Sequence, residues 1–403
     1  MIFSKSPFPA APRTVSLLLV AFTAAFAQPD DAAQMRQKAA TLTAQGNYAT
    51  AEPLLALALA TQEKATGPED VSLTGYLEPL AALYRAEGRN PDAQKLYERS
   101  LAIHQKAVGA NSLDLIPDLK SLAIVYAAMR QDVESEVDYL RVIALREKAK
   151  GPDDLDLARD CADLAGFYIA RKRFAVAEPN LRRAISIIQK NLGNLSTSLI
   201  PPLDALVGVY LQRQNLPATE EPLRQEISIE ESVYGPNDDK VATYLDQLAM
   251  VFYQESRFAD AQLLFERTLP IWDAVLKPYD PALASALDNL AVVYAAQKKF
   301  AKAEPLYRRS LAIRQKSTVE SLNNLALALE GKDENAAAER LYQRAVPMAE
   351  QITHLPGRAN VGEVLLLIMT LKDYAGLLRK LDRTVEAAKI EARATKLQLT
   401  PAQ

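Results

Sequence analysis

Apolar and polar positions along this chain repeat with a period of 42 residues. The clearest column holds one leucine in each repeat, namely Leu80, Leu122, Leu164, Leu206, Leu248 and Leu290. A small residue, alanine or valine, follows each leucine, and an aromatic residue stands four places after it, as at Tyr84 and Tyr126. Spacings of three and four place such residues on one side of an α-helix. The pattern therefore predicts one amphipathic helix in each repeat, called helix A below.

A second amphipathic helix, helix B, follows each helix A. It is marked by a Leu or Ile column and, eight places earlier, by the small residues Ala51, Ala93, Ser135, Ala177, Thr219, Ala261 and Ala303. Seven copies follow one another without an insertion or a deletion. One helix pair of this size cannot bury its own apolar faces, whereas stacking on neighbouring pairs buries them continuously. We therefore expect an all-α solenoid.

The connections between repeats contain two recurring signals. Glycines recur in register at Gly67, Gly109, Gly151, Gly193 and Gly235, where the left-handed conformation closes the last turn of a helix. Three residues later stand the N-cap residues Asp70, Ser112, Asp154, Ser196, Asp238 and Asp280. We expect helix B to stop at the glycine and the next helix A to start at the Asp or Ser. Lys277 replaces the sixth glycine, so that turn should differ.

Prolines stand at two places in the B helices. Pro53, Pro179 and Pro305 recur at multiples of 42, and we interpret them as residues of the first helical turn, where a missing N–H has no partner to lose. Pro270 and Pro347 stand halfway along B helices and should kink or end them early.

The first 27 residues differ from the rest of the chain. Lys5 and Arg13 precede an apolar run from Val15, which ends in the small-x-small pattern completed by Ala27. This is typical of a secretory signal peptide, and the run is short for a membrane anchor. We expect residues 1–27 to be removed, the remaining chain to be periplasmic or secreted by a bacterium, and no integral membrane span to remain.

The repeats drift toward the C-terminus. The segment around Ala336 stands 35 residues after its counterpart near Ala301, and the connection before it lacks the usual Gly and Asp. Including a helix pair before the first full repeat and a weak last copy, we count about nine pairs in residues 28–403. Their expected ranges are 32–66, 71–108, 113–150, 155–192, 197–234, 239–276, 281–316, 318–353 and 360–398.

The columns resemble the tetratricopeptide repeat, in the 42-residue variety found in kinesin light chains. The segment from Leu287 to Lys316, "LDNLAVVYAAQKKFAKAEPLYRRSLAIRQK", carries L-x-N-L-A-x-x-Y and then A-E-x-L-Y-x-R-x-L-x-I. The resemblance covers nearly the whole of the chain after residue 27. It implies a right-handed α-α superhelix whose concave face is lined by the A helices, and a ligand segment lying in that groove. Such repeats serve as scaffolds in unrelated processes.

No motif for chemistry stands out. The two histidines, His104 and His354, fall in a variable column and in a loop, and we expect His104 to be solvated. Cys161 occupies a column that is otherwise leucine, which indicates a buried hydrophobe rather than a nucleophile. Acidic connector segments lack the ligand spacing of a calcium loop. We therefore expect no catalytic residue, no cofactor and no metal ion, and we predict that the protein is not an enzyme.

The resemblance implies that ligand-facing positions lie on the A helices. At these positions stands an acidic row, Asp204, Asp246 and Asp288, together with the amides Gln247, Asn289, Asn324, Gln212 and Gln254. Amides can bond an extended peptide through both donor and acceptor, and an acidic row favours a basic segment. The alternative is that the row is a solvated face or supports neighbouring turns. Trp272 is open to two interpretations, an exposed anchor for a partner or the cover of a local apolar patch.

Charge gives no support for nucleic-acid or anionic-membrane binding, because residues 28–403 hold 45 Lys and Arg against 50 Asp and Glu. The sequence thus predicts a scaffold that binds a protein or peptide segment. Two other functions stay open, an accessory subunit of an extracytoplasmic enzyme system and a structural spacer. The sequence does not identify the partner or the oligomeric state.

Overall fold

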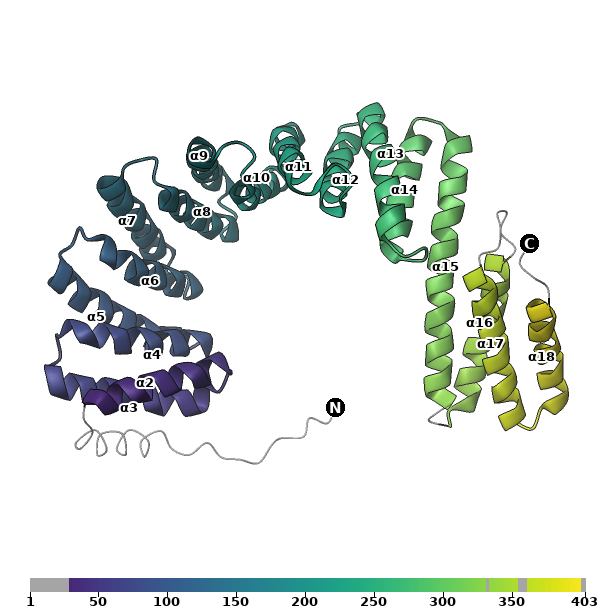
Figure 1. Cartoon of the computed structure of the whole chain (residues 1–403), viewed down its shortest axis with the longest axis horizontal. Helices are drawn as coiled ribbons and strands as arrows, with labels where there is room; N and C mark the ends of the chain where they lie inside the picture. The colour runs from purple at the N-terminus through teal and green to yellow at the C-terminus, as the bar shows by residue number, and fades with distance from the viewer. Residues whose placement is uncertain (1–28, 331–332, 354–360, 400–403) are drawn as a thin grey trace. The chain divides into compact units, whose positions relative to one another are not determined.

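The computed structural model describes residues 29–330, 333–353 and 361–399. These residues form seventeen α-helices, four short 3-10 helices and no strand (Figure 1). The expected signal peptide, residues 1–27, and His354 lie outside the described residues. The chain divides into two compact units, of which the first ends at Val209 and the second begins at Tyr210.

The first unit contains helices in strict A and B alternation. They are α2 (Pro29–Ala44), α3 (Tyr48–Thr66), η1 (Val71–Leu73), α4 (Thr74–Ala86), α5 (Asn90–Val108), η2 (Leu113–Leu115), α6 (Ile116–Ala128), α7 (Asp132–Lys150), α8 (Leu155–Ala170), α9 (Phe174–Leu192), η3 (Thr197–Leu199) and α10 (Ile200–Gln212), which runs into the second unit.

The second unit begins in the same way, but the pattern changes at the seventh helix pair of the chain. Its helices are η4 (Leu216–Thr219), α11 (Glu220–Tyr234), α12 (Asp239–Gln254), α13 (Phe258–Val275), α14 (Pro281–Ala296), α15 (Phe300–Glu330), α16 (Asn335–Thr353), α17 (Val361–Lys380) and α18 (Thr384–Leu399). The helix α15 is one continuous element that contains helix B of the seventh pair and helix A of the eighth. With α15 counted in both pairs, the nine expected helix pairs are present, and the prediction of an all-α solenoid is confirmed.

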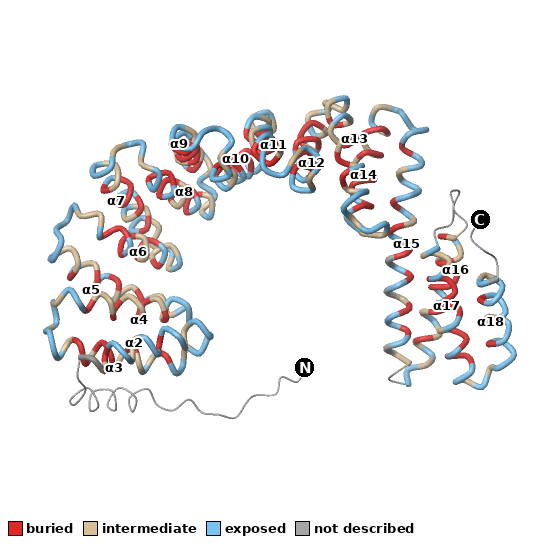
Figure 2. Tube along the Cα trace, in the orientation of Figure 1, coloured by how far each residue is buried: buried red, intermediate tan, exposed pale blue. Residues whose placement is uncertain are grey.

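The 42-residue leucine column forms the core. Leu80, Leu122, Leu164, Leu206, Leu248 and Leu290 are all buried, and buried residues follow the inner sides of the helices throughout each unit (Figure 2). Cys161 is fully buried, as expected. Burial raises the pKa of its thiol to about 11. The Cys161 side chain is therefore packed as a small hydrophobe.

The predicted connector signals are confirmed, with one change. Each cap residue from Asp70 to Asp280 accepts a bond from the backbone N–H two residues on. Gly67 closes α3 at φ 94° and ψ 165°, and the other four glycines of this column also have positive φ. With ψ near 165° this is the region open almost only to glycine, not the expected left-handed helical region. Where Lys277 replaces the glycine, α13 ends at Val275 and the following cap residue, Leu276, has extended backbone.

The recurring prolines do not lie in the first helical turn as predicted, and Pro270 and Pro347 do not end their helices. The B helices begin at Tyr48, Phe174 and Phe300, so the recurring prolines, Pro305 among them, are the sixth residues and lie in the second turn. The helices α13 and α16 continue through Pro270 and Pro347 to Val275 and Thr353 rather than ending there. The neighbouring helices on which each B helix packs hold these turns together despite the lost hydrogen bond.

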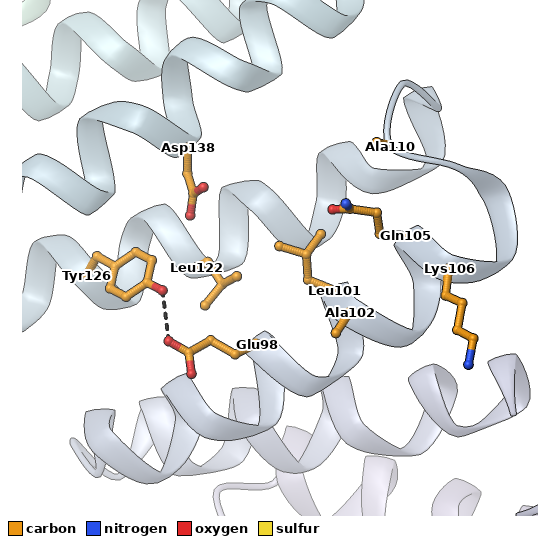
Figure 3. Close-up of a pocket in the computed structure, with 9 residues that line it drawn as sticks. All are labelled: Glu98, Leu101, Ala102, Gln105, Lys106, Ala110, Leu122, Tyr126 and Asp138. Carbon is orange, nitrogen blue, oxygen red and sulfur yellow. Dashed lines mark hydrogen bonds between the residues drawn. The ribbon is translucent and has the colours of Figure 1, made fainter. Parts of the chain in front are cut away.

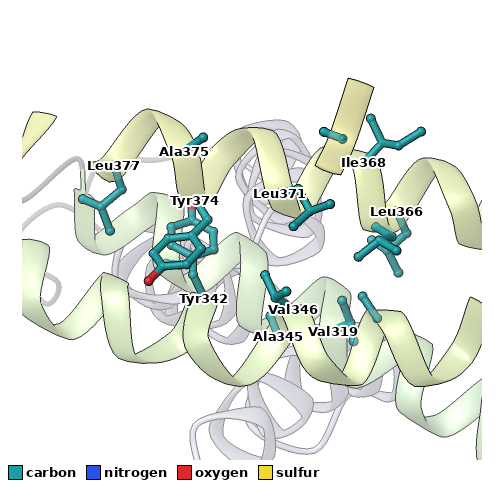
Figure 4. Packing of buried hydrophobic residues seen from close by; sticks show 14 of the residues in the cluster. Val319, Tyr342, Ala345, Val346, Leu366, Ile368, Leu371, Tyr374, Ala375 and Leu377 are labelled. Carbon is teal, nitrogen blue, oxygen red and sulfur yellow. The ribbon is translucent and has the colours of Figure 1, made fainter. Parts of the chain in front are cut away.

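The last three helices share a core with the second half of α15. Val319 and Ala326 of α15 pack with Tyr342 and Val346 of α16 and with Leu371 of α17 (Figure 4). The rings of Tyr342 and Tyr374 stack with centroids 5.6 Å apart. No helix of the described residues is both long and apolar enough to cross a membrane.

Candidate functional site

The predicted ligand-facing residues lie on four helices, α10, α12, α14 and α15. Asp204, Gln212, Gln247, Gln254 and Asn324 are exposed. Asp246, Asp288 and Asn289 are half-buried. Most of the amides are therefore exposed, whereas Asp246 and Asp288 are partly withdrawn from solvent.

Asp246 is bound by helix B of its own repeat. Thr268 donates a hydrogen bond to its Oδ1 over 2.5 Å, and the Trp272 indole N–H donates to its Oδ2 over 2.7 Å. Burial raises the pKa of the Asp246 carboxyl. Trp272 also packs on the cluster around Leu287. Asp246 therefore supports its repeat, and the structure favours the local interpretation of Trp272.

Asp288 makes the equivalent contact through a different partner. The Arg314 guanidinium of α15 donates to Asp288 Oδ2 over 2.6 Å, and both side chains are partly exposed. An exposed pair of this kind contributes little to stability, but it offsets the negative charge that the acidic row was expected to present. The proposal that this row binds a basic segment stays a prediction.

In the second repeat, the positions equivalent to Asp246, Thr268 and Trp272 belong to a polar cluster. We call it the Glu78 layer, and it consists of Glu78 of α4, Ser100 and His104 of α5, and Asp118 of α6. Ser100 Oγ lies 3.3 Å from Glu78 Oε1 and 3.1 Å from Asp118 Oδ1, and His104 Nδ1 lies 2.8 Å from Asp118 Oδ2. Asp118 is 1% exposed. The expectation that His104 is solvated was wrong, because the next helix A supplies a buried carboxylate that the column of helix B residues did not reveal.

The Glu78 layer has the composition of a metal site. Glu78, His104 and Asp118 each offer one ligand atom, and these atoms lie within 4.8 Å of one another. One imidazole with two carboxylates is a set that suits zinc. The same atoms are already joined by hydrogen bonds, and burial together with Asp118 raises the pKa of Glu78, so that a proton can serve in place of a cation. We interpret the group as a structural polar cluster.

One repeat later, permanent cations take the places of Glu78 and His104, while an aspartate, Asp160, again stands in the place of Asp118. In this Lys120 layer, Lys120 of α6 donates to Asp160 Oδ1 over 2.8 Å and pairs with Asp163 Oδ2 at 2.5 Å. Arg146 of α7 pairs with Asp160 through Nε and with Asp156 at 3.2 Å. Asp160 and Asp163 belong to α8. The buried Asp160 is thus held between two cations.

In the following repeat the positions of Lys120, Arg146 and Asp160 are held by apolar residues. A pocket lies there, which we call the Ala162 pocket. Ala162 of α8, Ile188 of α9 and Pro202 of α10 line it together with Leu155 and Leu192, and its volume is about 510 Å³. Asp156 and Arg159 also line it. Sequence reasoning missed this pocket. The available signal was that three columns, which hold titratable side chains in the two preceding repeats, change here to Ala162, Ile188 and Pro202.

A second hollow lies among α5, α6 and α7 (Figure 3). Tyr126 donates a hydrogen bond to Glu98 Oε1 over 2.9 Å, and Asp138 points into the same space. Burial, aided by the charge of Glu98, raises the pKa of Asp138 to about 6. This hollow is polar and open, so it offers less apolar surface to a ligand than the Ala162 pocket does.

Comparison with known proteins identifies the repeat. Sequence models of the tetratricopeptide repeat match residues 71–148 and 264–316 and residues 32–71 and 318–352, together about half of the chain. No curated protein matches.

Several solved structures are similar to this chain. A kinesin light chain with nearly identical tetratricopeptide-like repeats from Podosopora anserina is 21% identical, with a TM-score of 0.42 over 50% of this chain and 95% of that one. Aspartyl phosphate phosphatase F from Bacillus subtilis is 13% identical, with a TM-score of 0.40 over 94% of this chain and 96% of that one. The quorum sensor NprR from B. thuringiensis is 14% identical, with a TM-score of 0.34 over 92% and 98%.

The repeat pattern, the helix pairs and the matched segments agree along the chain. Repeats of this kind indicate a scaffold for protein–protein interaction. The chain belongs to the tetratricopeptide repeat family.

Proposed function

We propose that this protein is an exported scaffold that binds a peptide segment of a partner protein along its A helices and performs no chemistry. Tetratricopeptide repeat proteins are generally non-catalytic scaffolds. The observation that carries the proposal is the pocket of about 510 Å³ lined by Ala162, Ile188 and Pro202. It is formed by two successive A helices and the helix B between them, and it offers an apolar surface for one anchoring side chain.

Polar groups beside the pocket suit a peptide backbone and its charges. Asp156 pairs with Arg159 at 3.6 Å, and the Arg159 side chain is 76% exposed. The proposed ligand is therefore an extended segment with an apolar anchor and polar or charged neighbours. In the second unit, taken by itself, the exposed amides Gln247 and Gln254 of α12 offer donors and acceptors to a peptide, and an acidic row favours a basic residue in such a segment.

Filling the pocket tests this function. Peptides that bind the full-length chain are selected from a displayed library of random linear sequences, and their affinities are measured by fluorescence anisotropy. Ala162→Arg should weaken binding by about tenfold or more, because it places a charge in the space of the apolar anchor. Ala175→Arg, on an exposed position of α9, is the matched control. Equal affinity for both variants, or no selected peptide, would overturn the peptide-binding proposal.

The exported location has its own test. The mass and N-terminal sequence of the chain are determined after expression in a bacterium with its own N-terminal segment. We expect a chain that begins at Gln28 in the extracytoplasmic fraction. An intact N-terminus in the cytoplasmic fraction would contradict this part of the proposal and leave the peptide-binding part standing.

A further inference from the structure

Each half of α15 exposes a leucine whose equivalents in the regular repeats are buried or half-buried. Leu325, in the second half, occupies the column of Leu80 and its five equivalents after the seven-residue shortening. Those six leucines are at most 4% exposed, whereas Leu325 is 52% exposed. Leu311, in the first half, is also 52% exposed, although its equivalents, such as Leu59 and Ile143, are buried or half-buried.

A third residue extends the uncovered face of the first half. Tyr307 is 39% exposed, whereas its equivalents Tyr97, Tyr139, Leu181, Leu223 and Phe265 are at most 8% exposed. Phe300 is 64% exposed. Together with Leu311, these residues line an open hollow of about 440 Å³ on this half of α15.

The reason for this exposure is the continuity of α15. At a regular junction, helix B packs against helix A of the next repeat, and Leu101 of α5, for example, packs on the cluster of Leu122 of α6. Leu311 and Leu325 are the counterparts of that pair. Because they lie on one straight helix, about 21 Å apart along its axis, they cannot meet within the chain (Figure 1).

We propose that α15 pairs with α15 of a second copy of this chain, in antiparallel orientation, so that Leu311 of each copy packs against Leu325 of the other. The two leucines are separated by two heptads and therefore lie on one stripe of the helix. A two-fold axis near Thr318 brings both pairs together at once, as an isologous dimer requires. The second half of α15 and helix α16 of each copy then take the place that the eighth repeat would occupy beside the seventh repeat of the other copy.

The packing of α15 within its own chain leaves the stripe of Leu311 and Leu325 uncovered. The first half of α15 packs on α14, and the second half packs on α16 and α17 through Val319 and Ala326 (Figure 4). Leu325 lies outside that cluster. The occupant is a second copy because the chain itself carries both halves of the contact that the other junctions make.

Cysteine cross-linking tests the pairing. Full-length Leu311→Cys and Leu325→Cys variants are mixed, oxidised and run on a non-reducing gel, and we expect a disulfide-linked dimer as the main product. Either variant alone should stay unlinked, because the antiparallel arrangement places two copies of the same position far apart. The wild type is a control for Cys161, which is buried.

A further mixture tests the face of the helix. Leu311→Cys with Leu327→Cys should not form the dimer, because Leu327 is exposed but is turned away from the stripe. No dimer from the Leu311→Cys and Leu325→Cys mixture would overturn the proposal. So would a double variant that forms only an intrachain disulfide, since that result shows the eighth repeat folded back on the seventh.

The association itself is measured by analytical ultracentrifugation of the full chain. Leu311→Arg should raise the dimer dissociation constant by about a hundredfold or more, because the substitution occurs twice at the two-fold interface. Leu263→Arg on α13, where Leu263 is 64% exposed, should leave it unchanged. A wild type that stays monomeric at all concentrations, or equal dissociation constants for the two variants, would contradict the proposal.

Discussion

The Glu78 layer and the Lys120 layer occupy equivalent positions in adjacent repeats, yet they neutralise a buried aspartate in different ways. Asp160 is held by Lys120 and Arg146, two permanent cations. Asp118 has Ser100 and His104 as partners, and the neighbouring Glu78 adds a second carboxyl group. The same arrangement of helices therefore accommodates either permanent ion pairs, as in the Lys120 layer, or a hydrogen-bonded cluster whose charge depends on its protonation state, as in the Glu78 layer. The difference shows that these positions hold the repeats together without sharing one chemistry.

The largest effect is expected from Arg146→Ala. Asp160 is 2% exposed, and loss of one of its two cations should lower the free energy of unfolding by about 3 kcal/mol. Urea denaturation followed by circular dichroism measures the change. Arg159→Ala, which removes an exposed partner of Asp156, should cost less than about 1 kcal/mol. Equal losses would show that the buried pair does not stabilise the Lys120 layer.

The thiol of Cys161 reports whether that layer opens locally. Cys161 follows Asp160 directly, and burial raises its pKa to about 11, so labelling of the native wild type with a thiol reagent should be slow. Arg146→Ala should speed labelling by up to about a hundredfold, in line with its loss of stability. Disruption of the Glu78 layer by His104→Ala should speed the labelling of Cys161 less. Fast labelling of the native wild type would contradict the buried register of this residue.

A smaller effect is expected from His104→Ala. Asp118 would keep Ser100 but lose the hydrogen bond from the imidazole, at a cost of about 1–2 kcal/mol. Urea denaturation near neutral pH measures it, with Gln105→Ala on the same helix as control. If His104 were solvated as its sequence column suggested, the two variants would be equally stable.

The smallest effect is a pH dependence from Glu78→Gln. Burial and the charge of Asp118 raise the pKa of Glu78 in the folded protein, so the folded state holds this proton more tightly than the unfolded state. The stability contributed by the protonated group is present below the ordinary glutamate range and is lost as the pH rises through the folded pKa.

Denaturation of Glu78→Gln and the wild type across a pH series tests that sign. The glutamine variant should match the wild type in acid and become more stable toward neutral pH, by less than about 1 kcal/mol. Lys120→Gln is the contrasting variant, because it removes a cation from Asp160 and should be less stable than the wild type at neutral pH. A gain in stability from Glu78→Gln that appears only in acid would contradict a raised pKa of Glu78 in the folded protein.

The sequence predicted most of the fold because the period of 42 constrains each residue column several times. The core position of Cys161 and the caps from Asp70 to Asp280 followed from that register. The starts of the B helices did not follow, because proline favours the first helical turn and yet stands here in the second turn. The continuity of α15 was not predicted either, since a missing Gly and Asp connector is compatible with both a short loop and an unbroken helix.

The candidate site was less predictable. The expected ligand-facing positions are found on the A helices, but Asp246 and Asp288 are engaged by Trp272 and Arg314 from the neighbouring B helices. Similarly, Asp118 engages His104 from the next helix A. Single columns describe one helix at a time, whereas these contacts join columns separated by 14 or 26 residues. The Ala162 pocket arises in the same way from three columns read together.

The unbroken α15 also determines how the C-terminal repeats unfold. In a repeat protein, cooperativity passes from one repeat to the next through their interfaces. At this junction the helices after α15 are joined to the preceding repeat through α15 itself and through the hydrogen bond from Tyr279 to Glu363, rather than through a regular helix B to helix A contact. In a single copy, residues 335–399 should therefore melt as a unit of their own, before the helices that precede α15. In the proposed dimer a second copy restores the missing interface, so that the two transitions merge as the protein concentration rises.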